Sequence, residues 1–243
     1  MISFTGLKSF KGKVFLDIGC GSGLYSLTAF QLGAKKIISF DIDPFSIKCT
    51  EYLHKQAGSP KKWKIYSGSI LEKNFIKKLG KFDMVYSWGV LHHTGKMWQA
   101  IKLSSELVKK NGYLYIAIYN KTEGWGIWTD GRFGPSKFWI CEKKIYSHLP
   151  LFIQNIIDYS VMTLLIFLYL VTLKNPIKKM KEHKKFRGMA WRTDIKDWLG
   201  GYPYDYASPD EIFKFCKNLG FSLENLKTNF SLMNNEYLFK KVK

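Results

Sequence analysis

The stretch VFLDIGCGSG, residues 14–23, decides the fold of this chain. Residues 14–18 form a short apolar run that contains one acid, Asp17, and Gly19, Gly21 and Gly23 follow at alternate positions. A short apolar run that ends in glycine is typical of a strand buried on both faces. Glycine lets the backbone approach a ligand because no side chain stands between them. The stretch therefore predicts a buried strand followed by a turn that binds a small molecule.

Strand and helix patterns alternate along the chain beyond this stretch. We expect further strands over 36–43, 63–70, 82–89 and 112–120, and helices over 24–34, 44–58 and 97–112. Pro44 is suited to the first position of the second helix, and Gly33 to the end of the first. Repeated strand–helix units predict an α/β fold with a doubly wound, mostly parallel sheet.

The end of the chain has a different order of elements. Ser208, Pro209 and Glu211 predict a helix with an N-terminal capping box, and Gly220 is suited to its end. Two strand-like segments, 221–230 and 235–243, follow with no helical pattern between them. We expect them to pair as an antiparallel hairpin at the edge of the sheet.

The glycine turn and two acids indicate the kind of ligand. The spacing is GxGxG, whereas a dinucleotide-binding turn has GxGxxG with a pyrophosphate at the helix N-terminus. Asp17 would repel a pyrophosphate but favours a cationic group. Asp41, at the end of the second strand, can accept hydrogen bonds from two ribose hydroxyls. The pattern favours a positively charged nucleoside without phosphate and disfavours a nicotinamide-dependent dehydrogenase.

Three segments together, FLDIGCGSG, ISFDIDP and FDMVYSWGVLHH, resemble the class I S-adenosylmethionine-dependent methyltransferases, small-molecule and quinone-type enzymes among them. The resemblance is strong over residues 12–120. It implies a Rossmann-like sheet of seven strands whose last strand is inserted antiparallel. It also implies S-adenosyl-L-methionine as cofactor and transfer of its methyl group to an acceptor.

The resemblance also implies roles for individual residues. Gly19 and Gly21 would contact the methionine part of the cofactor through their backbone, Asp17 would support its ammonium group, and Asp41 would bind the ribose. Ile42 would form the apolar wall of the adenine. Many relatives have an acid after the third strand, where this chain has Ser69. The complete predicted cofactor site consists of Asp17, Gly19, Gly21, Gly23, Asp41, Ile42, Ser69, Ile70 and Ser87.

The acceptor is expected at the carboxyl ends of the fourth and fifth strands, because ligands of open α/β sheets bind there. Methyl transfer is an in-line displacement, so the protein mainly aligns the reactants and excludes water. Residues in this region are Ser87, Trp88, His92, His93, Tyr119 and Asn120. Of these, His92, His93 and Tyr119 are the catalytic candidates. Neighbouring side chains point in different directions, so we expect at most one histidine to face the acceptor.

The sequence predicts an insertion between the fifth strand and the final helix. We assign residues 1–121 to the cofactor-binding core, 122–205 to the insertion, and 206–243 to the elements that complete the sheet. Residues 122–146, rich in tryptophan and glycine, are suited to a lid over the acceptor. The apolar segment 151–173 precedes a basic run over 174–187. It fits a buried lid helix, a helix at an anionic membrane surface, or a membrane span, although Asp158 leaves an uncharged stretch shorter than the ~18 residues that a span needs.

Composition limits the remaining alternatives. The chain has 243 residues, a net charge of +19 and four cysteines without a CxxC pair, so no metal site or disulfide framework is expected. Almost all the positive charge is lysine, which fits either a biased composition or an anionic partner such as a membrane surface or RNA. We expect a methyltransferase that acts at oxygen or carbon of a small or lipid-like acceptor, in the cytoplasm or at the inner face of a membrane. An RNA methyltransferase and an inert cofactor-binding or membrane-surface module remain as alternatives.

Overall fold

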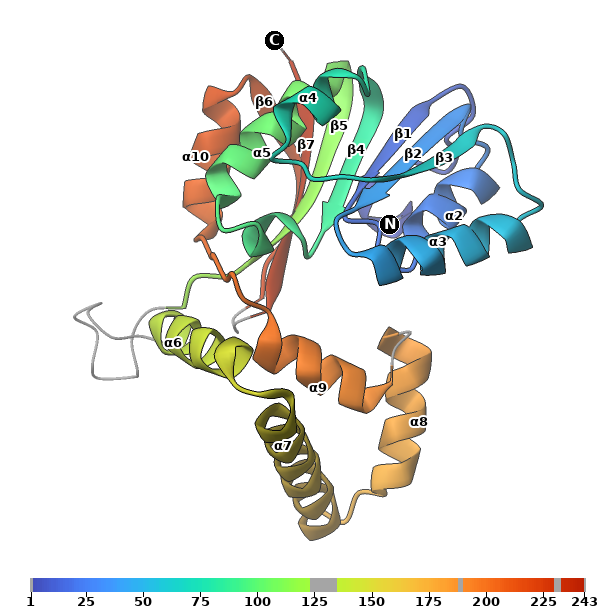
Figure 1. Ribbon diagram of the computed structural model, residues 1–243. Coiled ribbons are helices and arrows are strands. Elements are labelled where there is room, and N and C mark those ends of the chain that lie inside the picture. Colours follow the sequence, from blue (N-terminus) through green and yellow to red (C-terminus); the bar gives the residue numbers. More distant parts are fainter. Residues whose placement is uncertain (1, 123–134, 188–189, 230–232, 243) are drawn as a thin grey trace. The chain divides into compact units, whose positions relative to one another are not determined.

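The computed structural model describes residues 2–122, 135–187, 190–229 and 233–242 (Figure 1). The chain divides into two compact units. Unit 1 comprises Met1–Glu123 and Asp205–Lys243, and unit 2 comprises Gly124–Tyr204.

Unit 1 is built on one sheet of seven strands in the order β3-β2-β1-β4-β5-β7-β6. The first five strands run parallel, and β7 lies antiparallel between β5 and β6. This arrangement confirms the predicted fold class, including the inserted antiparallel strand. The strands are β1 (Val14–Ile18), β2 (Lys36–Asp41), β3 (Trp63–Ser67), β4 (Phe82–Trp88), β5 (Val108–Tyr119), β6 (Phe221–Lys227) and β7 (Asn234–Lys241).

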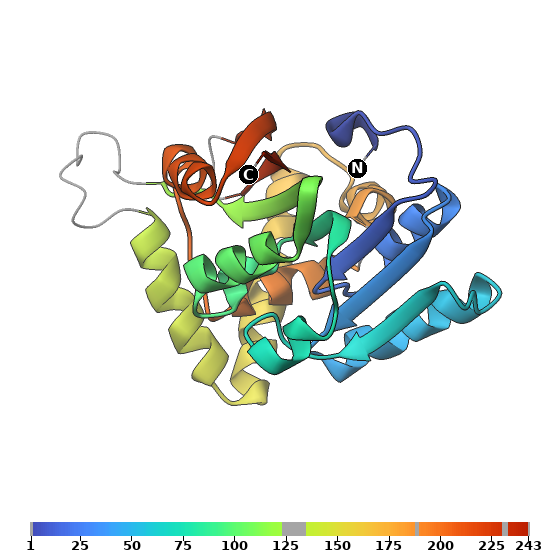
Figure 2. The same ribbon diagram turned by 90° about the horizontal axis from the view of Figure 1, so that it is seen from above.

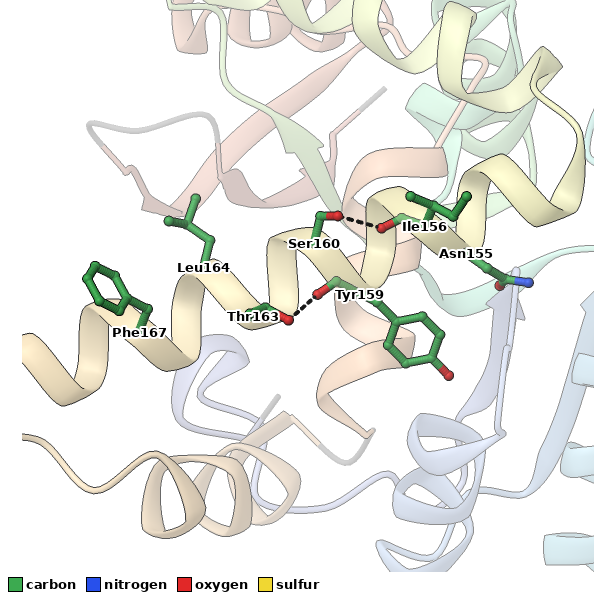
Figure 3. A pocket seen from close by; sticks show the side chains of 7 residues that line it. All are labelled: Asn155, Ile156, Tyr159, Ser160, Thr163, Leu164 and Phe167. Atoms are coloured by element: carbon green, nitrogen blue, oxygen red, sulfur yellow. Dashed lines mark hydrogen bonds between the residues drawn. The ribbon is translucent and has the colours of Figure 1, made fainter.

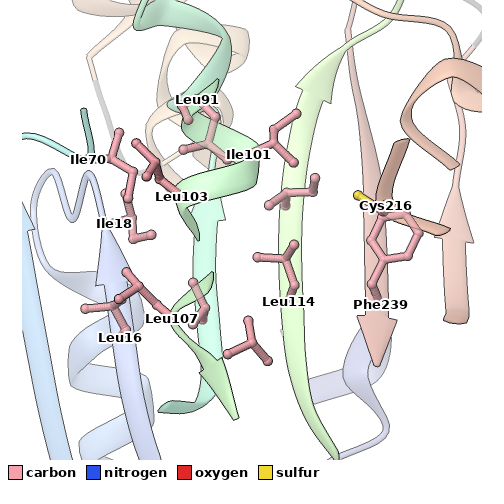
Figure 4. Packing of buried hydrophobic residues seen from close by; sticks show 14 of the residues in the cluster. Leu16, Ile18, Ile70, Leu91, Ile101, Leu103, Leu107, Leu114, Cys216 and Phe239 are labelled. Carbon is pink, nitrogen blue, oxygen red and sulfur yellow. The ribbon is translucent and has the colours of Figure 1, made fainter. Parts of the chain in front are cut away.

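Helices cover both faces of this sheet (Figures 1 and 2). In β1, Leu16 and Ile18 belong to the core beneath α4 (Lys73–Lys77), α5 (Met97–Glu106) and α10 (Pro209–Asn218). Phe15 belongs to the core beneath α2 (Leu24–Gln31) and α3 (Pro44–Gln56). Alternate residues of a strand point to opposite faces, so β1 is apolar apart from Asp17 because both faces are buried. Figure 4 shows the first of these two cores. The helical segments of unit 1 are α1 (Ile2–Thr5), α2 (Leu24–Gln31), α3 (Pro44–Gln56), α4 (Lys73–Lys77), η1 (Leu91–His93), α5 (Met97–Glu106) and α10 (Pro209–Asn218).

The capping box predicted for the last helix is present. The Glu211 backbone NH donates to Ser208 Oγ, and the Ser208 backbone NH donates to Glu211 Oε2 at 2.8 Å. Two amide groups at the start of α10 are thereby satisfied by side chains. This cap fixes where the chain enters the final helix and the β6–β7 hairpin.

The helix expected over 97–112 is shorter than predicted. It ends at Glu106, and β5 begins at Val108, which pairs with Phe82 before regular pairing resumes at Tyr113. Asn111 has φ +61°, a left-handed conformation, which an α-helix cannot accommodate. The segment therefore forms an irregular start of β5 instead of the end of α5.

Unit 2 consists of helical segments in the part that the structure describes: α6 (Pro135–His148), α7 (Leu151–Val171), α8 (Pro176–Arg187) and α9 (Trp191–Gly200). Tyr146, Ile195 and Leu199 form its small core, against which Ile157 and Val161 of α7 pack. Residues 123–134 of the expected lid lie outside the described residues.

Helix α7 is continuous through Asp158 and has 21 residues with a mean hydropathy of 1.8. Among the described residues it is the one helix whose length and composition suffice to cross a membrane. Asp158 does not interrupt the helix, because its carboxyl group is buried and accepts a hydrogen bond from the Tyr146 hydroxyl.

Candidate active site

The glycine turn between β1 and α2 has the left-handed backbone that favours glycine. Gly19, Gly21 and Gly23 have φ values of +68°, +53° and +80°. A Cβ atom at Gly19 would lie 2.5 Å from both Cγ atoms of Val90, and one at Gly23 would lie 2.9 Å from the Thr50 side chain. These two glycines are required by close packing within the protein as well as by their backbone conformation.

Gly21 differs from its two neighbours because a Cβ atom there would meet no protein atom within 4 Å. The residue is nevertheless held firmly. Its backbone NH donates to Asp41 Oδ2 at 2.9 Å, and its carbonyl accepts from Thr50 Oγ1 at 2.9 Å. A fixed, bare backbone that faces open space fits a ligand that approaches the turn closely.

Asp41 and Ile42 lie beside this turn at the carboxyl end of β2. The second carboxylate oxygen of Asp41 accepts from the Asp43 backbone NH at 3.0 Å, so both oxygens are oriented by backbone groups. The Ile42 side chain is 72% exposed although it is aliphatic. An oriented carboxylate next to an exposed apolar side chain suits a ligand with a sugar and a flat ring.

Asp17 lies beneath the turn and is only 2% exposed. Burial, with a contribution from the nearby charge of Asp41, raises its pKa to about 7, although a hydrogen bond from Ser26 opposes this shift. Ser26 Oγ donates to Asp17 Oδ2 at 2.6 Å and also contacts Ser39 Oγ at 2.6 Å, which accepts from Trp63 Nε1 at 2.8 Å. A buried hydrogen-bond chain thus connects β3, β2 and α2 to the acid of the glycine motif.

Three other residues of the predicted cofactor site line the neighbouring strand ends. Ser69 is half-buried, and its Oγ accepts from the Leu71 backbone NH at 3.2 Å. Ile70 is 3% exposed and belongs to the core. Ser87 is buried and donates to the Ile18 carbonyl at 3.2 Å, which ties β4 to β1. The side chains of Ile70 and Ser87 are therefore directed into the protein, and contact with a cofactor at these positions stays a prediction.

The three catalytic candidates come together after β4 and at the end of β5. The His92 and Tyr119 ring centroids are 4.2 Å apart, those of His92 and His93 are 4.4 Å apart, and those of His93 and Tyr119 are 5.5 Å apart. His92 is fully buried, whereas His93 and Tyr119 are half-buried. The histidines thus differ in exposure, and of the two only His93 presents part of its surface to solvent.

An asparagine cluster fixes the end of β5 next to this aromatic group. Asn120 donates from Nδ2 to the Asn229 carbonyl at 3.0 Å, and its Oδ1 accepts from Asn235 Nδ2 at 2.9 Å. Asn235 is itself fully buried. These bonds join β5 to the β6–β7 hairpin, so Asn120 has a structural place in the fold beside its predicted position near the acceptor.

Sequence reasoning missed Thr50 and Val90, which shape the glycine turn from distant parts of the chain. Thr50 Oγ1 also lies 3.4 Å from the Cys20 Sγ atom, and burial raises the pKa of that thiol. Neither residue has a local sequence signal.

Comparisons with known proteins agree with this geometry. The model of a family described as "Methyltransferase domain" matches residues 9–146, more than half of the chain. The ubiquinone biosynthesis O-methyltransferase of Pelagibacter ubique is 34% identical over 115 residues, which are 47% of this chain and 45% of that protein. This match, like that to the ribosomal protein L11 methyltransferase of Tolumonas auensis, covers less than half of the relative.

Solved structures share the fold at low sequence identity. PKMT2 from Rickettsia typhi has a TM-score of 0.62 and 13% identity, with 99% of this chain and 52% of that one covered. The magnesium protoporphyrin IX methyltransferase of Synechocystis, solved with bound SAH, has a TM-score of 0.54 and 16% identity, with 96% and 75% covered. The family match over more than half of the chain, the shared fold and the glycine turn agree. This chain belongs to the methyltransferase-domain family, the class I S-adenosylmethionine-dependent methyltransferases.

Proposed function

We propose that the protein transfers a methyl group from S-adenosylmethionine to oxygen or carbon of a small or lipid-like molecule with a planar ring. The observation that carries this proposal is the group of aromatic rings formed by His92, His93 and Tyr119 at 4.2 to 5.5 Å from one another. They follow β4 and β5, and the glycine turn and Asp41 follow the parallel strands β1 and β2. Carboxyl ends of parallel strands share one edge of the sheet, so the proposed cofactor and acceptor sites would lie at the same edge.

The residues around the glycine turn fit the cofactor. Gly21 would receive its methionine part on bare backbone, Asp41 would accept hydrogen bonds from the ribose, and Ile42 would lie against the adenine. When bound, S-adenosylmethionine supplies a methyl group on a positively charged sulfur. The buried acid Asp17 would favour the ammonium group electrostatically from beneath the turn, and this attraction would lower its raised pKa.

The acceptor side supplies positioning and a means of moving a proton. Flat aromatic side chains pack well against a planar acceptor. Half-buried Trp88 at the end of β4 would offer a further ring of this kind. An acceptor hydroxyl becomes a better nucleophile when a neighbouring base takes its proton. We assign this role to His93, because it is the more exposed of the two histidines, and a positioning contact to Tyr119.

RNA is the second candidate acceptor, and the net charge of +19 favours it. The tRNA U34 carboxymethyltransferase of Helicobacter pylori is among the relatives, 30% identical over 106 residues. The charge consists almost entirely of lysine, which lacks the planar fork with which arginine binds phosphate or guanine at two points.

The test is a radiolabel transfer assay with S-adenosylmethionine and a panel of hydroxylated quinones, catechols, porphyrins and total RNA. We expect transfer to a hydroxylated ring compound, a loss of kcat in His93→Gln, and a rise in KM in Tyr119→Phe. The matched control is Tyr113→Phe, which removes a tyrosine hydroxyl in the middle of β5, six residues before Tyr119. Labelling of RNA alone would replace the proposal with the second candidate, and no labelling by protein that binds S-adenosylhomocysteine would favour an inert module.

A further inference from the structure

Helix α7 of unit 2 has two apolar faces, and the helices of its unit cover one of them. Ile157, Val161 and Leu165 pack against the small core of the unit. The opposite side, here called the outward face, follows the three- and four-residue spacing of a helix surface. All its members are exposed: Phe152, Ile156, Tyr159, Ser160, Thr163, Leu164, Phe167, Leu170 and Val171. An apolar face of this length is unusual for a helix that contacts only water.

The two aliphatic hydroxyl groups on the outward face, those of Ser160 and Thr163, are satisfied within the helix itself. Ser160 Oγ donates to the Ile156 carbonyl and Thr163 Oγ1 to the Tyr159 carbonyl, both at 2.8 Å (Figure 3). Hydroxyls bonded in this way to the preceding turn need no water as partner. The outward face can therefore enter an apolar phase at a lower cost than its sequence suggests.

The polar groups of the other face are turned into unit 2. Asp158 is 1% exposed and accepts a hydrogen bond from the Tyr146 hydroxyl at 2.5 Å. Gln154 donates to the carbonyls of Tyr146 and Leu149. Because this side is bonded to α6, α7 cannot be surrounded by lipid while unit 2 is intact. One face is available to a membrane and the other is not.

A strongly basic segment follows the apolar helix directly. Between positions 174 and 187 the sequence has seven lysines and arginines and one glutamate, Glu182. Lys174, Lys178 and Lys181 are exposed. On the outward face itself, the Arg192 guanidinium of α9 lies 4.7 Å from the Tyr159 ring and donates to Asn155. Lysine, arginine and tyrosine beside an apolar face are typical of a helix at the lipid–water boundary.

We propose that the outward face of α7 and the lysines that follow it form a docking surface for an anionic lipid bilayer. The helix lies in the plane of the headgroups, with its outward face toward the acyl chains and Lys174, Lys178 and Lys181 on the anionic headgroups. The proposal goes beyond the proposed function and does not depend on it. Apolar burial and charge act together here, as stable peripheral binding requires.

Two other occupants would use only part of these features. RNA would be held by the lysines, but it gives a nine-residue outward face with mainly apolar side chains nothing to bind. A second copy of the chain would cover the apolar face, yet it would bring together two segments that each carry the same strong positive charge. An anionic bilayer complements both the apolar face and the charge.

The experiment is sedimentation of the full chain with vesicles of phosphatidylcholine alone or mixed with phosphatidylglycerol. We expect binding only to the anionic vesicles, weakened by salt. Leu164→Glu with Phe167→Glu, and separately Lys178→Glu with Lys181→Glu, should each lower the bound fraction roughly tenfold or more. S-adenosylhomocysteine affinity, measured on the same samples, reports folding of unit 1 and separates this test from that of the proposed function.

Control variants on unit 1 carry charge changes of the same sign. Tyr52→Glu replaces an exposed apolar side chain of α3, and Lys61→Glu with Lys64→Glu reverses two exposed lysines. We expect these variants to sediment like the wild type. The proposal is overturned if the wild-type protein does not sediment with anionic vesicles, or if the control variants and the test variants lose binding equally. Light scattering that shows a dimer dissociated by Leu164→Glu would assign the face to a second copy, and RNA binding lost only in the lysine variant would assign the charge to RNA.

Discussion

The glycine turn of unit 1 and the outward face of α7 in unit 2 both look unusual in the sequence, but for opposite physical reasons. In the turn, Gly19 and Gly21 have hardly any freedom: their backbone angles are left-handed, and each is bonded or packed against distant residues. On α7 the side chains of Phe152, Ile156 and Phe167 are 59% to 65% exposed and touch little. A ligand-binding turn is specified residue by residue, whereas a surface that binds a bilayer needs only an apolar area and charge.

Gly19→Ala should produce the largest effect on stability and on cofactor binding. If the variant were as stable as the wild type, the glycine turn would not be specified residue by residue. The new Cβ atom would sit 2.5 Å from the Val90 side chain in a left-handed backbone. We expect a loss of about 3 kcal/mol or more in the free energy of unfolding, together with loss of cofactor binding. Denaturant unfolding and calorimetry with S-adenosylhomocysteine measure the two effects.

Gly21→Ala is the matched variant because its Cβ atom meets no protein atom. We expect a loss of only about 1 kcal/mol from the left-handed backbone, but a loss of cofactor affinity as large as that of Gly19→Ala. The pair separates packing from ligand contact. Equal stability of the two variants would contradict the claim that the Val90 side chain excludes a Cβ atom at position 19. As a further test, Gly19→Ala combined with Val90→Ala should recover part of the stability that Gly19→Ala loses.

Asp17→Asn should change how stability depends on pH. The pKa of Asp17 is about 7 in the folded protein and near 3.8 when unfolded, so the folded state binds more protons between pH 4 and pH 7. The contribution of this group to stability is present below pH 4 and is lost as pH rises to 7, with a slope of up to ~1.4 kcal/mol per pH unit. The asparagine variant should lack this decline in denaturant unfolding of the cofactor-free protein.

Asp43→Asn is the control for this pH dependence. Hydrogen bonds from Ser46 lower the pKa of Asp43, so it titrates below pH 4 in both states. Its variant should keep the wild-type slope between pH 4 and pH 7. A slope unchanged in Asp17→Asn would show that the carboxyl group is already ionised when cofactor is absent.

Tyr146→Phe should have the smallest effect on cofactor binding and sharpens the separation of the two units. It removes the hydroxyl that donates to buried Asp158, at a cost of about 1 to 3 kcal/mol to unit 2. Tyr159→Phe, which alters an exposed tyrosine of the same helix, should leave stability unchanged. The affinity of Tyr146→Phe for S-adenosylhomocysteine should stay at the wild-type value. A lower affinity in this variant would show that the two units are coupled.

The sequence predicted unit 1 well because several independent constraints act on the same residues. Strand periodicity, glycine spacing and the positions of Asp17 and Asp41 all indicate one fold and one class of ligand. What it did not predict depends on contacts between distant segments. Val90 determines that residue 19 is glycine, and Thr50 holds the Gly21 carbonyl, yet neither has a local pattern. The left-handed Asn111, which lies in the stretch that was expected to be helical and is part of β5, was not predicted either.

Unit 2 was harder because α7 is apolar on both faces. A helix with one apolar stripe reveals which side packs, but here periodicity gives no such signal. Asp158 looked like an interruption of the apolar run, whereas the hydroxyl of Tyr146 lets it lie inside the unit. The choice between lid, surface helix and span therefore needed knowledge of which face is packed.

The most direct test of the account is calorimetric titration of the protein with S-adenosylhomocysteine, with NAD in parallel. We predict binding of one S-adenosylhomocysteine in the micromolar range, no binding of NAD, and affinity lost in Asp41→Ala. Asp43→Ala, which removes a neighbouring carboxylate at the start of α3, should keep most of the affinity. Folded wild-type protein that binds NAD, or that binds no S-adenosylhomocysteine, would contradict the assignment of the glycine turn and Asp41 as the cofactor site.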